Sequence, residues 1–362
     1  MRTRTGTAVC GEVELFYEDL GDPAGAPVLL IMGVGAQLPM WPDGFCELLI
    51  ERGYRVIRYD HRDIGLSTKM AGQKADGSVY ARVARYAFGR TSPVPYTLVD
   101  MAEDAKGLLD HLEIDRAHVV GASMGGMIAQ ILAGSHPDRV GSLALLMTSS
   151  GKPLSALPRW RVIKLALDPP AKDAPTEDKV AFEVRNIAVI NGPNFLPSDE
   201  QLRSRVEHLT ARSDYPQGGL RQFDAILGTG SLLRFTRRIE APTVVIHGSK
   251  DPMVRIRNGR NLARIIKGAR FVVVDGMGHD LPAPVWRPMV DCAGRELPAR
   301  ALSQRATGGR APRPLPSRRR RRGRNRADRP ATAGRVRQGR PHTSPRRPWR
   351  RWVGPRGVAN RL

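Results

Sequence analysis

The chain has 362 residues, enough to bury a large hydrophobic core. Its formal net charge of +23 would indicate a nucleic-acid-binding protein if the charge were spread evenly. It is concentrated instead, because residues 291–362 contain 22 arginines and three acidic residues, whereas residues 1–290 contain 36 basic and 32 acidic residues. The body of the chain is therefore nearly neutral, and the basic character belongs to its last fifth.

The chain contains three cysteines, Cys10, Cys46 and Cys292. An odd number without paired spacing argues against a disulfide framework and against a zinc site. The N-terminal segment is basic but has no apolar stretch of signal-peptide length. No run approaches the roughly 18 apolar residues that span a bilayer. We therefore predict a soluble, cytoplasmic protein.

Apolar runs alternate with amphipathic segments along most of the body. Strands are predicted over residues 13–18, 27–32, 54–59, 117–120, 140–147, 243–247 and 269–275. Helices are predicted over residues 43–52, 97–112, 124–136 and 255–266, with a last helix beginning near Ala283. This alternation indicates an α/β fold with a mostly parallel sheet and helices on both of its faces.

Two segments depart from the alternation of strands and helices. Residues 152–238 are helical or irregular with prolines at the joints, and they are too long for a loop. We therefore predict a helical cap over 152–238, inserted into a core formed by residues 1–151 and 239–290. Residues 291–362 are rich in arginine, proline, glycine and alanine and hold five consecutive arginines at Arg318–Arg322. Such a composition buries little apolar surface, so a disordered tail is predicted there.

The central motif is Gly121-Ala122-Ser123-Met124-Gly125, which fits the pattern G-x-S-x-G. The pattern alone is weak, but here it follows an apolar strand and opens a helix, as a nucleophile elbow does. The turn would place the Ser123 hydroxyl at a helix N-terminus, where free N–H groups favour a developing negative charge. We predict Ser123 as the nucleophile; the alternative is a glycine-rich turn with a surface serine.

A serine needs a base to take its proton, and in this architecture the expected chain order is serine, acid, histidine. His279 lies in a glycine-rich loop after a strong strand, where it can reach the carboxyl edge of the sheet. His136 is expected to end a helix, His208 to lie on a charged helix of the cap, and His247 to pack at the end of a strand. We predict His279 as the general base.

The acid should follow the strand that precedes the strand of His279. Asp251 stands there in a turn, and its carboxylate would accept a hydrogen bond from the other ring nitrogen of His279. The alternative for Asp251 is a turn or helix cap. Asp275 and Asp280 are rivals, but both are so close in sequence to His279 that local turn roles are expected.

An oxyanion hole requires two backbone donors. One would be the amide of Met124, directly after the nucleophile, and the other the amide of Val34, in the loop Gly33–Gly35 after the strand 27–32. The alternative for this loop is an ordinary glycine turn.

Five segments together carry a resemblance to α/β-hydrolases, within which the chain is most similar to aclacinomycin methylesterase-like enzymes and the mycobacterial Lip lipase/esterase group. These segments are LLIMGVGAQ (29–37), VIRYDHRDIGLST (56–68), AHVVGASMGGMIAQ (117–130), TVVIHGSKDPMV (243–254) and VVVDGMGHDLP (272–282). The resemblance covers roughly residues 5–290. It implies an α/β-hydrolase fold with a helical cap, cleavage of carboxylic esters and no cofactor or metal.

The resemblance assigns the family's nucleophile, acid and base to Ser123, Asp251 and His279, and its oxyanion donors to Val34 and Met124. It gives structural roles to three residues of the turn after the strand 54–59, which are Asp60, Arg62 and Ser67. Met32 departs from the family, since many relatives have histidine before Gly33, but the donor is a main-chain group. Epoxide and haloalkane hydrolysis are disfavoured, because those relatives carry aspartate in place of the nucleophilic serine.

The expected activity is that of a carboxylesterase or lipase-like enzyme on a small hydrophobic ester, with thioesterase or phospholipase action of the same triad as alternatives. Apolar residues of the cap predict either a substrate pocket or packing of the cap onto the body: Leu154, Leu157, Trp160, Ile163, Phe195, Leu196, Phe223, Ile226 and Leu227. The oligomeric state is not specified by the sequence.

The segment 291–362 has no counterpart in the resemblance, so an out-of-frame reading of GC-rich DNA or a recent extension is expected. No specific nucleic-acid partner is predicted for it. A weak, nonspecific contact with anionic polymers or membranes is the non-enzymatic alternative.

Overall fold

The computed structural model describes residues 2–153, 158–166, 174–294 and 350–352. The chain divides into two units, of which the second, residues 304–348, lies outside the described residues. The first unit contains every element described below. Most of the predicted tail 291–362 also lies outside the described residues; within it, residues 291–294 end a helix and residues 350–352 form a short strand.

The described strands form one sheet in the order β1-β2-β4-β3-β5-β6-β7-β8-β9. Its strands are β1 (Thr3–Cys10), β2 (Val13–Leu20), β3 (Ala26–Ile31), β4 (Tyr54–Tyr59), β5 (Ala117–Ala122), β6 (Val140–Leu146), β7 (Thr243–Gly248), β8 (Arg270–Val274) and β9 (Arg350–Trp352). The pairs β1–β2 and β2–β4 are antiparallel, and all the others are parallel. The predicted mostly parallel sheet is confirmed. Strand β1 was not expected, because its residues are largely exposed and polar.

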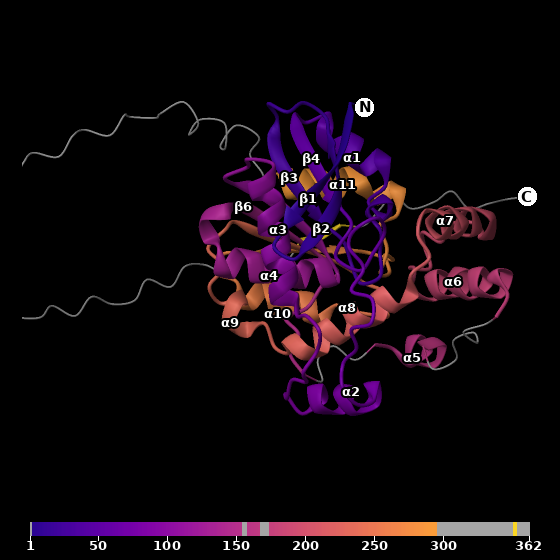
Figure 1. The fold of residues 1–362 in the computed structure, drawn as a ribbon. Helices are drawn as coiled ribbons and strands as arrows, with labels where there is room; N and C mark the ends of the chain where they lie inside the picture. The colour runs from indigo at the N-terminus through magenta and orange to yellow at the C-terminus, as the bar shows by residue number, and fades with distance from the viewer. Residues whose placement is uncertain (1, 154–157, 167–173, 295–349, 353–362) are drawn as a thin grey trace, which may run out of the picture. The chain divides into compact units, whose positions relative to one another are not determined.

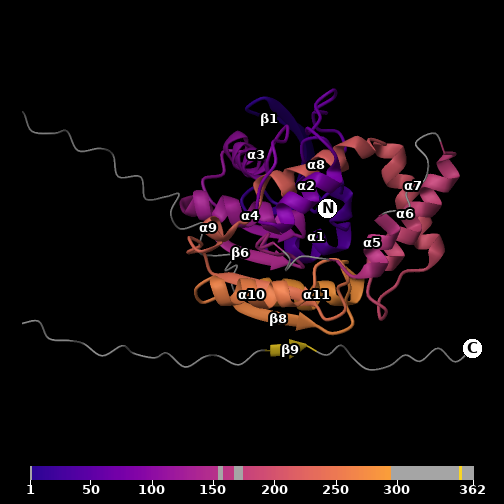
Figure 2. The same cartoon turned by 90° about the horizontal axis from the view of Figure 1, so that it is seen from below.

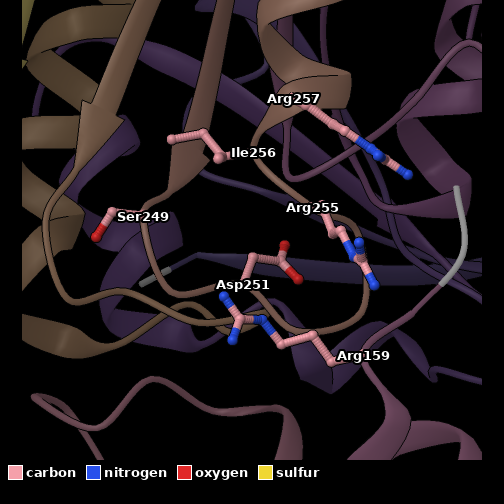
Figure 3. A pocket seen from close by; sticks show the side chains of 6 residues that line it. All are labelled: Arg159, Ser249, Asp251, Arg255, Ile256 and Arg257. Carbon is pink, nitrogen blue, oxygen red and sulfur yellow. The ribbon is translucent and has the colours of Figure 1, made fainter. Parts of the chain in front are cut away.

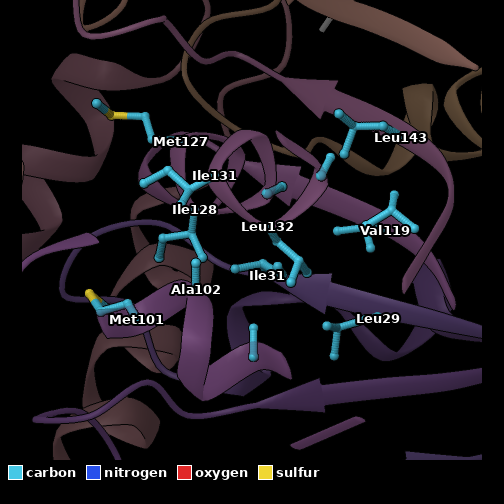
Figure 4. Packing of buried hydrophobic residues seen from close by; sticks show 14 of the residues in the cluster. Leu29, Ile31, Met101, Ala102, Val119, Met127, Ile128, Ile131, Leu132 and Leu143 are labelled. Carbon is cyan, nitrogen blue, oxygen red and sulfur yellow. The ribbon is translucent and has the colours of Figure 1, made fainter. Parts of the chain in front are cut away.

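Helices cover both faces of the sheet, and side chains of alternate strand residues pack against them. Leu29 and Ile31 of β3 belong to a core cluster with α3 (Leu98–His111) and α4 (Met124–Ser135), part of which is drawn in Figure 4. Their neighbours Val28 and Leu30 belong to the opposite cluster. That second cluster also holds buried residues of α1 (Asp43–Ile50) and α11 (Ala283–Gly294). Helix α10 (Arg257–Ile265) contributes Leu262 to the first cluster.

A run of helices without strands separates β6 from β7. It consists of α5 (Trp160–Ala166), α6 (Thr176–Ile190), α7 (Asp199–Arg212), α8 (Pro216–Thr229) and α9 (Leu233–Thr236). Figures 1 and 2 both show α5, α6 and α7 grouped beside the sheet. By contrast, α8 contacts α3 and α9 contacts α4. The helical segment falls within the predicted cap, and residues 154–157 and 167–173 of it lie outside the described residues.

Helix α2 (Val79–Ala87) lies between β4 and α3, where the sequence analysis predicted no helix. Its Arg82 is buried and donates two hydrogen bonds to Asp224 of α8, at 2.8 Å from Nε to Oδ1 and 3.0 Å from Nη2 to Oδ2. The Arg82 guanidinium also donates to the backbone oxygens of Asp76 and Gly77. A paired, buried charge thus attaches α2 to α8.

This ion pair generates a stability prediction. The substitution Arg82→Met should lower the free energy of unfolding by about 3–5 kcal/mol, because it leaves the Asp224 carboxylate buried without its partner. The double variant R82M/D224L should have a free energy of unfolding much closer to that of the wild type, since neither charge remains buried without a partner. Urea unfolding at neutral pH measures both effects. A single variant that costs no more than the double variant would contradict the argument.

Candidate active site

Ser123 occupies a strained turn between β5 and α4. Its backbone angles are φ 53° and ψ −119°, a conformation that costs a non-glycine residue free energy unless the surroundings enforce it. The Ser123 N–H donates to the Leu146 carbonyl at 3.0 Å. Its carbonyl accepts from the Thr148 hydroxyl at 2.6 Å. The end of β6 and the residues after it therefore hold the peptide groups of the serine in place.

The glycines of the motif are required by close packing. A Cβ added to Gly121 would lie 2.5 Å from the carbonyl oxygen of Gly125, and one added to Gly125 would lie 2.0 Å from the carbonyl oxygen of Ile31. Side chains at these two positions would push α4 away from β5 and β3. The glycines of the pattern G-x-S-x-G are therefore required because the backbones of β3, β5 and α4 are in direct contact.

His279 meets the serine from the loop between β8 and α11. Its Nε2 lies 2.9 Å from the Ser123 Oγ, and its side chain is 7% exposed. The His279 N–H donates to the carbonyl of Ile190, the last residue of α6, at 2.8 Å. A Cβ added to Gly278 would lie 2.2 Å from the nitrogen of Gly192. The end of α6 and the residues after it, which belong to the predicted cap, therefore pack directly on the loop that carries His279.

Asp251 completes the chain of hydrogen bonds. Its Oδ2 lies 2.8 Å from the Nδ1 of His279, and its Oδ1 accepts from the amides of Met253 and Val254 at 2.9 and 2.8 Å. A second histidine, His247 of β7, places its Nε2 3.5 Å from the same Oδ2, next to its 2.6 Å hydrogen bond with the Val254 carbonyl. The sequence analysis assigned His247 a packing role only, although its spacing of four residues from Asp251 was a signal of proximity.

The electrostatics of the site favour a charged pair. Burial opposes ionisation of Asp251, but the charge of His279 and hydrogen bonds from His247 and His279 outweigh it, so the pKa of the Asp251 carboxyl lies well below its usual range. Burial also opposes the charged imidazole, yet Asp251, with Asp280 contributing less, raises the pKa of His279. Burial raises the pKa of the Asp280 carboxyl to about 6, against two backbone hydrogen bonds.

The loop after β3 lies beside Ser123. A Cβ added to Gly33 would lie 3.3 Å from the Cβ of Ser123. In the described part of the structure, neither the Val34 amide nor the Met124 amide donates to a protein acceptor. Both amides are therefore free to donate to a substrate. Gln222 of α8 accepts a hydrogen bond from the Gly35 amide of this loop at 2.8 Å, and the sequence analysis did not identify it.

The remaining predicted residues have structural contacts. Arg62 makes a bidentate ion pair with Asp104, at 2.6 and 2.7 Å, and the Ser67 hydroxyl donates to the Asp60 carbonyl at 2.6 Å. His136 ends α4, as predicted.

Asp275 and Asp280 have local contacts, and His208 is exposed to solvent. His208 is an exposed residue of α7. Asp275 accepts from the Ser249 hydroxyl at 3.0 Å, a contact within the turns after β7 and β8. Asp280 accepts from the Gly278 amide at 3.1 Å, as expected for a local turn role.

A cavity of about 370 Å³ adjoins the acid. Its lining includes Asp251, Ser249 and Ile256 together with Arg159, Arg255 and Arg257, all drawn in Figure 3. Three guanidinium groups against one carboxylate make this cavity positive. Neither Ser123 nor His279 is among the residues that line this cavity.

The apolar residues predicted for the cap divide into several groups. Phe195, Ile226 and Leu227 pack against the core or are buried. Leu196 is 51% exposed and lines a second cavity beside Arg159 and Lys250. Trp160 and Phe223 are exposed. The side chains of Leu154, Leu157 and Ile163 lie outside those described.

Comparison with known proteins establishes the family. Residues 26–282 match the model of the alpha/beta hydrolase fold family, so the chain belongs to this family, as the sequence resemblance indicated. The family and the fold support a hydrolase that acts on ester bonds.

Among curated relatives, the rhodomycin D methylesterase DnrP of Streptomyces peucetius is 32% identical over 307 residues, which cover 77% of this chain and 93% of that protein. A 2-hydroxy-6-oxononadienedioate/2-hydroxy-6-oxononatrienedioate hydrolase of Paraburkholderia xenovorans is 30% identical, over 74% of this chain and 85% of that protein. Among solved structures, a hydrolase from Pseudomonas aeruginosa PA01 superposes with a TM-score of 0.61 and 26% identity, covering 82% of this chain and 99% of that one.

Among the helices that the structure describes, none combines the length and the apolar character required to cross a membrane.

The packing of the elbow predicts that Gly125→Ala prevents stable folding, because the new methyl group would overlap the backbone of Ile31 at 2.0 Å. Gly219→Ala is the matched control on α8, where the added Cβ has only an ordinary contact at 3.5 Å with the Gly35 Cα; alanine there should raise stability by up to about 1 kcal/mol. Thermal unfolding followed by circular dichroism compares the two. Equal melting temperatures for G125A and the wild type would contradict this account.

Proposed function

We propose that this hydrolase cleaves carboxylic esters through an acyl-enzyme, with Ser123 as nucleophile, His279 as general base and Asp251 as the orienting acid. The observation that carries the proposal is the unbroken chain of hydrogen bonds from Ser123 Oγ through both ring nitrogens of His279 to Asp251. Its serine stands on the strained turn at the start of α4. This is the arrangement that activates a serine hydroxyl.

The geometry supports the following steps. Ser123 Oγ attacks the ester carbonyl carbon while His279 Nε2 accepts the hydroxyl proton. The amides of Val34 and Met124 donate to the carbonyl oxygen as it becomes negative. His279 then gives the proton to the leaving alcohol, and the acyl-enzyme remains. Water attacks the acyl-enzyme with His279 again as base, which releases the carboxylic acid and restores Ser123.

Asp251 stabilises the imidazolium that forms in both halves of the reaction. Its Oδ1 is held by two backbone amides, so Oδ2 stays directed at the Nδ1 of His279. This hydrogen bond fixes the tautomer in which Nε2 is free to accept a proton.

The relatives support an ester as substrate. Two curated relatives, DnrP and DauP of Streptomyces, carry the name rhodomycin D methylesterase and are 32% and 33% identical to this chain. We infer that a methyl or other small alkyl ester of a hydrophobic acid is the substrate class. Thioesters and phospholipids are the alternative substrates, because the same triad would attack their acyl carbonyl.

The first test is a panel of p-nitrophenyl esters of increasing acyl length, with methyl esters and thioesters, on wild type and Ser123→Ala. Loss of the Oγ should lower kcat by about three orders of magnitude or more on every substrate, since the triad acts as a unit. Ser204→Ala, on an exposed site of α7, is the control and should match the wild type. Turnover by Ser123→Ala at more than a tenth of the wild-type rate would refute the proposal.

The second test concerns pH. His279 must be neutral to accept the proton, so kcat/KM falls as the pH drops below the pKa of His279. Because that pKa is raised, the midpoint should lie above the ordinary value of roughly 6.5.

Asp280→Asn should move this midpoint to lower pH, because it removes a negative charge that favours the imidazolium. Asp138→Asn, at an exposed position, is the control. Profiles of kcat/KM from acidic to mildly alkaline pH measure the shift. An unchanged or higher midpoint in Asp280→Asn would contradict the electrostatic account.

A further inference from the structure

Gln222 of α8 joins the cap to the loop beside the nucleophile. Its side chain is completely buried. Its Oε1 accepts from the Gly35 amide at 2.8 Å, and its Nε2 donates to the Arg62 carbonyl at 2.9 Å. One side-chain amide therefore satisfies two backbone groups that come from the turns after β3 and β4.

The Gly35 amide belongs to the central peptide of a β-turn. The Ala36 N–H donates to the Gly33 carbonyl at 3.3 Å, and Gly35 has φ +69°. A glycine with positive φ at the third position is the pattern of a type II turn. Rotation of the Val34–Gly35 peptide interconverts turn types, so an acceptor for its N–H selects one orientation. Gln222 is that acceptor.

The same turn presents the predicted oxyanion donor. The Val34 N–H shares a peptide group with the Gly33 carbonyl, which accepts from Ala36 inside the turn. Because the peptide is trans, the Val34 N–H points away from the turn. Its direction depends on the turn keeping its shape. The turn lies next to Ser123, because a Cβ added to Gly33 would lie 3.7 Å from the Ser123 Oγ.

The end of the loop is held by α7 through Gln37. The Gln37 Nε2 donates to the carbonyls of Leu209 and Ser213 at 2.7 and 3.0 Å, and its Oε1 accepts from Arg212 at 2.8 Å. The loop after β3 is thus attached to two helices of the cap, and Gln222 is the attachment next to Val34.

We propose that Gln222 is a positioning residue for the oxyanion hole: from α8 it fixes the 33–36 turn so that the Val34 amide faces the oxyanion of the substrate. This proposal rests on the ester hydrolysis proposed above. If the proposal holds, catalysis requires that α8 is docked on the body of the molecule, because only then does Gln222 hold the turn that orients the Val34 amide.

The expected effect falls on the chemical step. An oxyanion donor acts on charge that develops in the transition state, so its displacement lowers kcat and leaves KM nearly unchanged. Removal of one donor costs about 10²–10³ in kcat. Displacement of the Val34 amide should cost less, about ten- to a hundredfold.

The test compares Gln222→Met, which keeps the shape without hydrogen bonds, with Gln222→Glu, which keeps an acceptor for Gly35. Gln130→Met is the matched control. Gln130 is also fully buried, donates to the carbonyls of Gly126 and Ser149 and accepts from Thr236, but makes no hydrogen bond to the 33–38 loop. Each variant is assayed in the full-length chain for kcat, KM and melting temperature with a p-nitrophenyl ester. Inhibition by a trifluoromethyl ketone, whose serine adduct carries an oxyanion, is measured beside it.

We expect kcat of Gln222→Met to fall ten- to a hundredfold with KM within about twofold, and the inhibition constant of the ketone to rise in parallel. Gln222→Glu should recover a large part of the wild-type kcat and of the wild-type affinity for the ketone. Gln130→Met should lower the melting temperature without this kinetic pattern. Should Gln222→Met fail to fold, Gln222→Asn replaces it, because its shorter side chain withdraws the acceptor while remaining polar.

The proposal is overturned if Gln222→Met, or Gln222→Asn in its place, keeps kcat within twofold, or if kcat falls equally in Gln130→Met. A change confined to KM would also overturn it, since that would indicate substrate binding. Ser123→Ala separates the two proposals: if it is inactive while Gln222→Met is normal, only the positioning role fails. If Ser123→Ala remains active, the proposed function itself fails.

Discussion

Direct backbone contact between β3, β5 and α4 is the constraint on which the rest of the site depends. The carbonyl of Ile31 and the backbone of Gly125 are too close for any side chain between them, and this closeness allows Ser123 to keep its unfavourable backbone angles. The strain is offset by packing in the core on both sides of the sheet. The proposed nucleophile, Ser123, is therefore held in one backbone conformation by the fold itself, and the other proposed catalytic groups lie on loops around it.

The positions of the His279 loop and the Val34 loop depend on contacts with the helical segment between β6 and β7. The loop of His279 is bonded to Ile190 at the end of α6, and the loop of Val34 is bonded to Gln222 of α8. The predicted cap thus makes two separate contacts near Ser123, one with the loop of His279 and one with the loop of Val34. The helical segment between β6 and β7 therefore contacts two loops of the proposed site, although no side chain of the proposed triad comes from it.

Much of this site could be predicted from the sequence, because its strongest signals are local. The glycines around Ser123 and the turns after β7 and β8 are short motifs, and parallel strands bring their carboxyl ends to one edge. Gln222 has no such signal: it lies 187 residues from Gly35, and its role depends on how α8 docks. Helix α2 was missed for a related reason, since the ion-pair partner of its buried Arg82 is Asp224, 142 residues away. Strand β1 lacks the apolar alternation on which strand prediction relies.

Buried ion pairs, together with apolar contacts, join α7 and α8 to the rest of the first unit. Arg221 of α8 makes two hydrogen bonds to Asp63, at 2.9 and 2.8 Å, and Arg212 of α7 lies 2.7 Å from the fully buried Asp60. Replacing such pairs by apolar side chains often stabilises a protein, so their value lies in geometry. A guanidinium fork fits a carboxylate in few orientations, and a helix that slid by one turn would leave both charges buried without partners. Apolar contacts would tolerate a small slide, whereas Gln222 could not hold the Gly35 amide after it. The Arg221–Asp63 ion pair and the buried Gln222 side chain therefore fix α8 in the same position.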